Sequence, residues 1–151
     1  MEQLFKTKEI ISNIFSSNIE EIKKVSLICN TISEKLLIAS ELETLKEYQE
    51  DLNINSILEL FLANKAATFC GGAALTLYKK LQELNFMPII FHYGNYNNGL
   101  THVVVLIKLK NEFYLFDPYF NIYYEDNLYN LIENIIGPIK KIKQVYANRP
   151  F

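Results

Sequence analysis

The sequence that decides the fold is THVVVLIKLKNEFYLFDPYFN, residues 101–121. It contains two runs rich in β-branched and aromatic residues, 101–109 and 112–119, which have the composition of β-strands. Only Lys110 and Asn111 separate the runs, and a polar pair of this kind is typical of a tight turn. We therefore predict an antiparallel hairpin over this stretch.

The register of this hairpin predicts a polar pair on one face of the sheet. A two-residue turn places Leu109 opposite Glu112, and side chains alternate between the two faces along each strand. His102 and Asp117 then share a face as diagonal neighbours, with β-carbons about 7 Å apart. A turn with an odd number of residues would place them on opposite faces. Because the rest of both strands is largely apolar, a histidine and an aspartate on one face indicate a functional site.

The sequence before the hairpin predicts helices followed by a first strand. Apolar residues recur at helical spacing through 1–63 and again through 70–84. The second of these helices is predicted to end at Asn85, a residue type that tolerates the left-handed conformation. Residues 88–93 form a β-rich run opened by a proline, and 94–99 have the glycines and asparagines of a loop. These segments indicate a helical part that leads into a sheet.

The sequence after the hairpin predicts a short helix over 126–136 and a last strand over 139–146. This order of elements favours an α+β fold, with a helical N-terminal half packed on a small antiparallel sheet. The length of 151 residues fits one domain. We expect a single domain over 1–151, in which 1–63 are the helical part and 64–151 hold a further helix and the sheet.

The composition argues against two classes of partner. The net charge is −2 and no basic stripe is present, so nothing in the charge pattern favours nucleic acid. No apolar run approaches the roughly 18 residues that a membrane-spanning helix requires. The first residues lack the pattern of a secretory signal peptide. We therefore expect a cytoplasmic protein, or one exported without an N-terminal signal, that binds neither nucleic acid nor a membrane.

The two cysteines of the chain have different sequence surroundings. Their spacing is not that of a disulfide framework or a structural zinc site, so we expect no metal and no cofactor. Cys29 lies in an apolar helical stretch and is predicted to belong to the core. Cys70 follows Thr68, a residue type that caps helices, and precedes Gly71 and Gly72. Cys70 is therefore predicted to begin a helix with little side-chain bulk around it.

The start of a helix is a favourable place for a nucleophilic thiol. The free backbone N–H groups and the positive end of the helix dipole favour a thiolate and can stabilise an oxyanion. Cys70, His102 and Asp117 supply, in this order, a nucleophile, a base and an orienting carboxylate. His92 is an alternative base, but no aspartate stands at a matching spacing from it. The alternative interpretation is a buried structural cysteine and a structural histidine.

The stretch TFCGGAALTLYKKLQELNFMPIIFHYG at 68–94, together with the hairpin sequence, resembles the transglutaminase-like branch of the papain-like superfamily. In that pattern a cysteine begins a helix, a turn and a strand follow, and a histidine-led strand and an Asp-Pro turn come next. The resemblance covers about residues 64–121, roughly the second third of the chain. It implies a papain-like or transglutaminase-like fold with Cys70 as nucleophile, His102 as base and Asp117 as the group that orients the base.

The chain departs from the family pattern at several points. It has no tryptophan, and Val103 and Val104 stand where an aromatic residue often follows the histidine. The Arg-Gly-Gly-x-Cys sequence of arylamine N-acetyltransferases is absent. The Cys-Gly-x-Ala, His-x-Val-Val and Asp-Pro sequences are also similar to bacteriocin-processing peptidases, which often carry a glutamine six residues before the cysteine. Asn64 stands at that position here and is a candidate donor to the oxyanion.

The residues and the resemblance together predict thiol-dependent cleavage or transfer at an amide bond of a peptide or protein substrate, through a thioester on Cys70. We expect hydrolysis, by a peptidase or a glutamine deamidase. A transglutaminase or another amine acyltransferase is the first alternative, and a non-catalytic binding module that keeps the fold is the second. Four tyrosines of the second half either line a substrate cleft or pack in the core and at its rim. They are Tyr119, Tyr123, Tyr124 and Tyr129.

Overall fold

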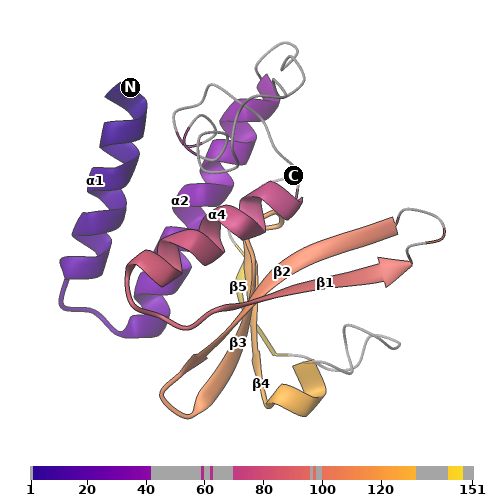
Figure 1. Ribbon diagram of the computed structural model, residues 1–151. Helices are drawn as coiled ribbons and strands as arrows, with labels where there is room; N and C mark the ends of the chain where they lie inside the picture. Colours follow the sequence, from indigo (N-terminus) through magenta and orange to yellow (C-terminus); the bar gives the residue numbers. More distant parts are fainter. Residues whose placement is uncertain are drawn as a thin grey trace.

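The computed structural model (Figure 1) places helices first along the chain and strands after them. The described residues are 2–41, 59, 62, 70–95, 97, 100–131 and 143–147. Their helices are α1 (Glu2–Ser16), α2 (Glu21–Glu41) and α4 (Cys70–Glu83). Their strands are β1 (Ile89–Asn95), β2 (Leu100–Leu109), β3 (Glu112–Asp117), β4 (Ile122–Asp126) and β5 (Lys143–Ala147). No helix in this part of the chain is long and apolar enough to cross a membrane.

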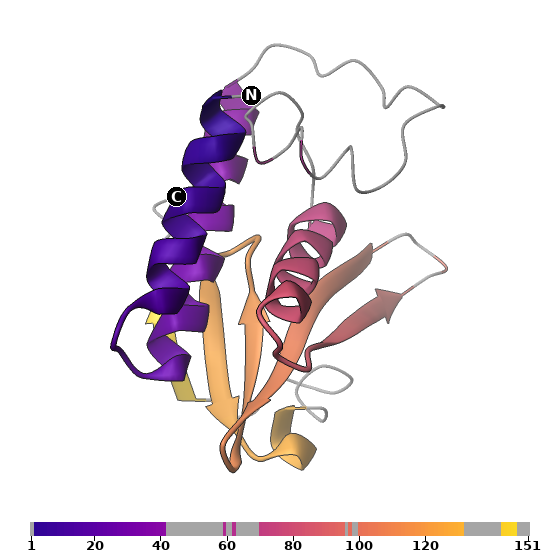
Figure 2. The same cartoon turned by 60° about the vertical axis from the view of Figure 1, so that its left-hand side comes forward.

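The described strands form one antiparallel sheet in chain order. Each strand pairs with the next one along the sequence, from β1 at one edge to β5 at the other. The helices lie on one side of this sheet, as Figure 2 shows, with α4 packed against β2 and α2 packed against α4. This arrangement of helices packed on an antiparallel sheet confirms the predicted α+β class.

Apolar side chains form one cluster on each face of the sheet. The helix-side core fills the space between the helices and the sheet. Its fully buried members include Ile28, Leu77, Val105, Ile107 and Phe116. The outer cluster covers the opposite face of the sheet. Its buried members are Val104, Leu106, Leu115 and Leu131. Both faces of the hairpin are therefore buried, as the near-continuous apolar residues along its strands predict.

The hairpin between β2 and β3 has the predicted register. Leu109 pairs with Glu112, so two residues form the turn. Lys110 in this turn takes a positive φ of 55°. The even turn places His102 and Asp117 on the same face of the sheet, the face of the outer cluster. The register thus brings the predicted polar pair together.

Strand β1 is longer than the sequence predicts. The prediction gives a strand over 88–93 and a loop over 94–99, whereas β1 continues to Asn95 and pairs there with Leu100 of β2. Gly94 takes a φ of 131°, which a residue without a β-carbon adopts readily. Pairing with β2 extends the strand into residues whose own composition favours a loop.

The chain after Asp117 also differs from the prediction. β4 was not predicted, and it ends where the predicted 126–136 helix was expected to begin. Helical residues occupy 128–131, and the rest of that predicted helix lies outside the described residues. The predicted 139–146 strand corresponds to β5 at its C-terminal end, and 139–142 lie outside the described residues. Apart from 59 and 62, residues 42–63 of the predicted helical half also lie outside them.

The end of α4 directs the chain into β1. Asn85 takes the left-handed conformation with a φ of 65°, as the sequence predicts. The backbone N–H of Phe86 donates to the carbonyl oxygen of Leu81 at 2.9 Å and closes the last turn of the helix. This compact end lets β1 begin after only a few residues, so α4 and β1 belong to one packed unit.

Two leucine-to-alanine substitutions test this core. Leu77 of α4 lies in the helix-side core and is 0% exposed, whereas Leu27 of α2 is 41% exposed. Leu77→Ala should lower the free energy of unfolding by about 2–5 kcal/mol, because it removes buried methyl groups and leaves a cavity. Leu27→Ala should lower it by less than about 1 kcal/mol. Urea unfolding measures both, and equal losses in the two variants would contradict the packing described here.

Candidate active site

A short hydrogen bond joins the predicted histidine and aspartate. His102 Nε2 lies 2.5 Å from Asp117 Oδ2. The Asp117 side chain is 6% exposed and the His102 side chain is 19% exposed, so the pair is shielded but reachable at its histidine end. The hairpin register produces this contact, because it sets the two residues diagonally on one face.

The second oxygen of Asp117 holds the turn that follows it. Asp117 Oδ1 accepts the backbone N–H of Tyr119 at 3.0 Å and that of Phe120 at 3.1 Å. Pro118, which directly follows Asp117, has no N–H, and an aspartate before a proline commonly starts a turn in this way. The carboxylate therefore has three hydrogen-bond partners, which stabilise its charge in a buried position. It is held in one orientation toward His102.

The orientation of the imidazole leaves one nitrogen for proton transfer. The carboxylate beside Nε2 favours the neutral tautomer that carries its proton on Nε2. The lone pair of His102 is then on Nδ1, and this atom is the candidate base. When the imidazole gains a proton at Nδ1, Asp117 remains hydrogen-bonded to Nε2 and stabilises the imidazolium.

Cys70 stands at the start of α4, close to the start of β2. Its side chain is half-buried. A β-carbon added to the next residue, Gly71, would lie 4.0 Å from Cγ2 of Val103, the neighbour of His102 in β2. Helix α4 packs along β2 from this point (Figure 1). The absence of a side chain at Gly71 lets the start of the helix approach the strand that carries the histidine.

Tyr93 joins this group, although the sequence analysis did not include it. It lies directly opposite His102 across the β1–β2 pair, and the two rings meet edge to face with centroids 5.7 Å apart. Burial, the largest cause, and the negative charges of Asp117, Tyr124 and Cys70 together raise the pKa of Tyr93 to about 12. The phenol of Tyr93 thus lies within electrostatic reach of both Asp117, the partner of His102, and Cys70, the candidate nucleophile.

The second cysteine and the second histidine take other places. Cys29 is 0% exposed in the helix-side core, as predicted, and burial raises the pKa of its thiol well above the ordinary value. His92 is exposed and precedes Tyr93 in β1, so it faces the side of the sheet opposite to His102 and Asp117. Of the two histidines, only His102 shares a face with Asp117.

The four tyrosines predicted to line a cleft or to pack in the core lie in different surroundings. Tyr119 packs edge to face on His102, with ring centroids 6.1 Å apart. Tyr123 is buried in the helix-side core, Tyr124 packs against the outer cluster, and Tyr129 is 68% exposed. Asn64 and the predicted cap Thr68 lie outside the described residues. Among the residues that the structure describes, no three His, Cys, Asp or Glu side chains gather in a way that could hold a metal ion.

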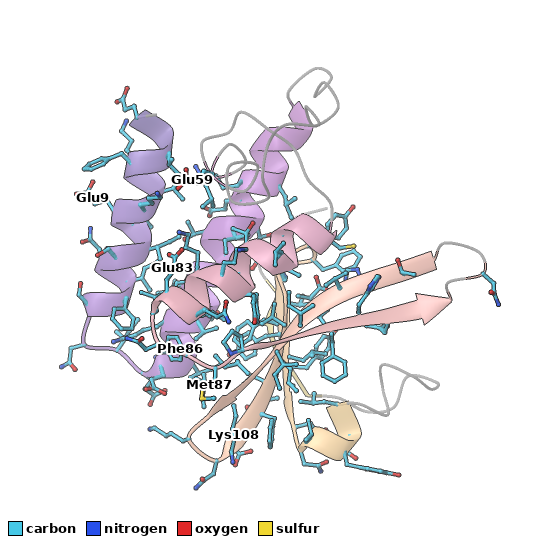
Figure 3. The ribbon with its side chains drawn as sticks, viewed as in Figure 1. Glu9, Glu59, Glu83, Phe86, Met87 and Lys108 are labelled. Carbon is cyan, nitrogen blue, oxygen red and sulfur yellow. The ribbon has the colours of Figure 1, made fainter. Side chains whose placement is uncertain are left out.

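A separate hollow of about 420 Å³ follows the second half of α4. Figure 3 shows Glu59 and Glu83, two of its lining residues, between α1 and α4. Its charged lining residues form two ion pairs, one between Lys8 Nζ of α1 and Glu59 Oε1 at 2.9 Å and one within α4 between Lys80 Nζ and Glu83 Oε2 at 2.8 Å. Cys70 begins the helix whose last residue is Glu83, about 20 Å away along the axis. This charged hollow is therefore distinct from the candidate active site.

A comparison of the chain with known protein families, with curated proteins and with solved structures finds no match. The assignment of the site therefore depends on the geometry and chemistry of its own residues.

The titration of Tyr93 tests whether Cys70 belongs to this group. Because the charge of Cys70 helps to raise the pKa of Tyr93, Cys70→Ala should lower that pKa from its value of about 12. Cys29→Ala is the matched control and should leave it unchanged. NMR of ¹³Cζ-labelled tyrosine, assigned with Tyr93→Phe, measures the pKa in each variant. An identical midpoint in Cys70→Ala and the unmodified protein would place the thiol away from Tyr93.

Proposed function

We propose that this protein is a cysteine-dependent enzyme with a papain-like or transglutaminase-like topology, and that it cleaves or transfers an amide bond of a peptide or protein. The observation that carries this proposal is the hydrogen bond between His102 and Asp117. Two further observations support it, namely that Cys70 begins a helix whose second residue lies near Val103 of β2, and that the charge of Cys70 acts on Tyr93, the residue opposite His102. A nucleophile, a base and a group that orients the base are the parts that covalent acyl transfer requires.

The first half of the proposed reaction forms a thioester. His102 Nδ1 takes the proton of the Cys70 thiol, and the resulting thiolate sulfur bonds to the carbonyl carbon of the substrate amide. The carbonyl oxygen becomes an oxyanion, which the backbone N–H groups at the start of α4 can receive. The carbon–nitrogen bond then breaks as the imidazolium of His102 returns its proton to the leaving nitrogen. An amine departs, and the acyl group remains on Cys70.

The second half returns the enzyme to its starting state. In hydrolysis, His102 takes a proton from water, the hydroxide oxygen bonds to the thioester carbon, and the sulfur of Cys70 leaves as a thiolate that recovers the proton. An amine in place of water gives acyl transfer by the same steps. We propose hydrolysis, by a peptidase or a glutamine deamidase, because Cys70 and His102 are both partly exposed and water can reach a thioester there. Asn64 is a further candidate donor to the oxyanion.

Mass spectrometry of a peptide mixture incubated with the protein tests this proposal. New peptide ends indicate a peptidase, a gain of one mass unit at glutamine indicates a deamidase, and adducts with an added primary amine indicate a transferase. Cys70→Ala should abolish all of these products, whereas Cys29→Ala should retain them. Asp117→Asn should lower kcat by at least about 10²-fold, because the carboxylate orients His102 and stabilises its cation.

A reactivity control separates this enzyme from a non-catalytic binding module with the same fold. Cys70 should react with iodoacetamide near neutral pH much faster than Cys29, which is buried and has a raised pKa. His102→Ala should slow the reaction of Cys70 because the base is lost. A Cys70 that reacts at the rate of an ordinary thiol, with no product from any peptide, would favour the binding module.

A further inference from the structure

We propose that three aromatic side chains around His102 form a subsite for a large apolar side chain of the substrate, on the amine side of the bond that is cleaved. The aromatic subsite consists of Tyr93, Tyr119 and Phe120. This inference rests on the proposed function and names the class of substrate that the site prefers.

The three rings surround the imidazole from different elements of the fold. Their centroids lie 5.7 Å, 6.1 Å and 5.4 Å from that of His102 for Tyr93, Tyr119 and Phe120, respectively. Tyr93 comes from β1, whereas Tyr119 and Phe120 come from the turn after β3. Phe120 is 38% exposed, so part of its apolar surface remains open to solvent beside His102.

The position of this surface is fixed by a residue of the candidate active site. Asp117 binds His102 with one carboxylate oxygen and accepts the N–H groups of Tyr119 and Phe120 with the other. The rings of Tyr119 and Phe120 also pack edge to face on each other, with centroids 5.0 Å apart. One carboxylate therefore fixes the orientation of the base and the position of two rings of the aromatic subsite. The base and these rings keep a constant geometry relative to each other.

The chemistry of the proposed reaction determines which part of the substrate contacts the aromatic subsite. His102 delivers its proton to the leaving nitrogen, so that nitrogen must come within hydrogen-bond reach of the imidazole. The residue attached to the leaving nitrogen is then the part of the substrate closest to the rings around His102. Its side chain is placed against the aromatic subsite, whereas the acyl side of the substrate lies toward Cys70.

The surroundings of the subsite favour an apolar side chain over a charged one. When His102 is protonated, its charge and that of the Asp117 carboxylate offset each other, so neither a cationic nor an anionic side chain gains a strong net attraction there. A lysine, arginine or carboxylate would lose hydration against the apolar rings. A phenylalanine, tyrosine, leucine or methionine buries apolar area with no such cost.

A library experiment tests this inference with the full chain. Synthetic peptides of mixed sequence with blocked amino ends are incubated with the protein, and mass spectrometry identifies the residue that bears each new amine. Large apolar residues should be cleaved at that position about tenfold faster than glycine. Phe120→Ala should reduce this ratio to near one, and Phe120→Leu should largely retain it. Phe5→Ala is the matched control, because Phe5 is 70% exposed on α1 and should leave the ratio unchanged.

The possible outcomes separate this inference from the proposed function. Cleavage without a preference, a preference for lysine, or an apolar preference that persists in Phe120→Ala would each overturn the aromatic subsite while the proposed function stands. Release of ammonia from glutamine as the only reaction would also overturn it, because the leaving group then has no side chain. If no peptide changes at all and Cys70 labels no faster than Cys29, the proposed function is wrong and the subsite falls with it.

Discussion

The hydrogen bond from His102 Nε2 to Asp117 Oδ2, 2.5 Å long, is the contact on which the candidate site depends. It joins two neighbouring strands and exists only because the turn between them has two residues. A one-residue change in that turn would move one partner to the other face of the sheet. The buried carboxylate needs this partner as much as the imidazole does, because a buried charge without hydrogen bonds is costly. Folding and the arrangement of the site are therefore coupled at one point.

The rest of the fold holds this pair between two apolar layers. The helix-side core fixes α4 against β2, and the start of α4, where Cys70 lies, comes near Val103, the neighbour of His102 in β2. The outer cluster covers the same face as the pair and shields Asp117 from water. Asp117 also holds the turn that carries Phe120, so the base and the surface beside it share one support. A single residue thus links the sheet, the proposed chemistry and the proposed choice of substrate.

The sequence predicted the parts of the site that depend on local rules. Alternation along a strand and an even turn were enough to pair His102 with Asp117. The position of Tyr93 could not be derived in this way, because its partner depends on where β1 and β2 pair across a connection that looks like a loop. The sequence did contain a clue, because Tyr93 and Phe91 are two residues apart and therefore lie on the same face of a strand. β4 was missed for the same reason, because pairing with β3 makes it a strand and its own composition is ambiguous.

The distance between the Cys70 sulfur and the His102 imidazole tests the central claim most directly, namely that Cys70, His102 and Asp117 form one catalytic group. A crystal structure of the full chain with a reduced Cys70 provides it. The account predicts that Sγ lies within about 4 Å of Nδ1, with Asp117 still bound to Nε2. A separation beyond about 8 Å, or an imidazole that presents Nε2 to the thiol, would contradict it.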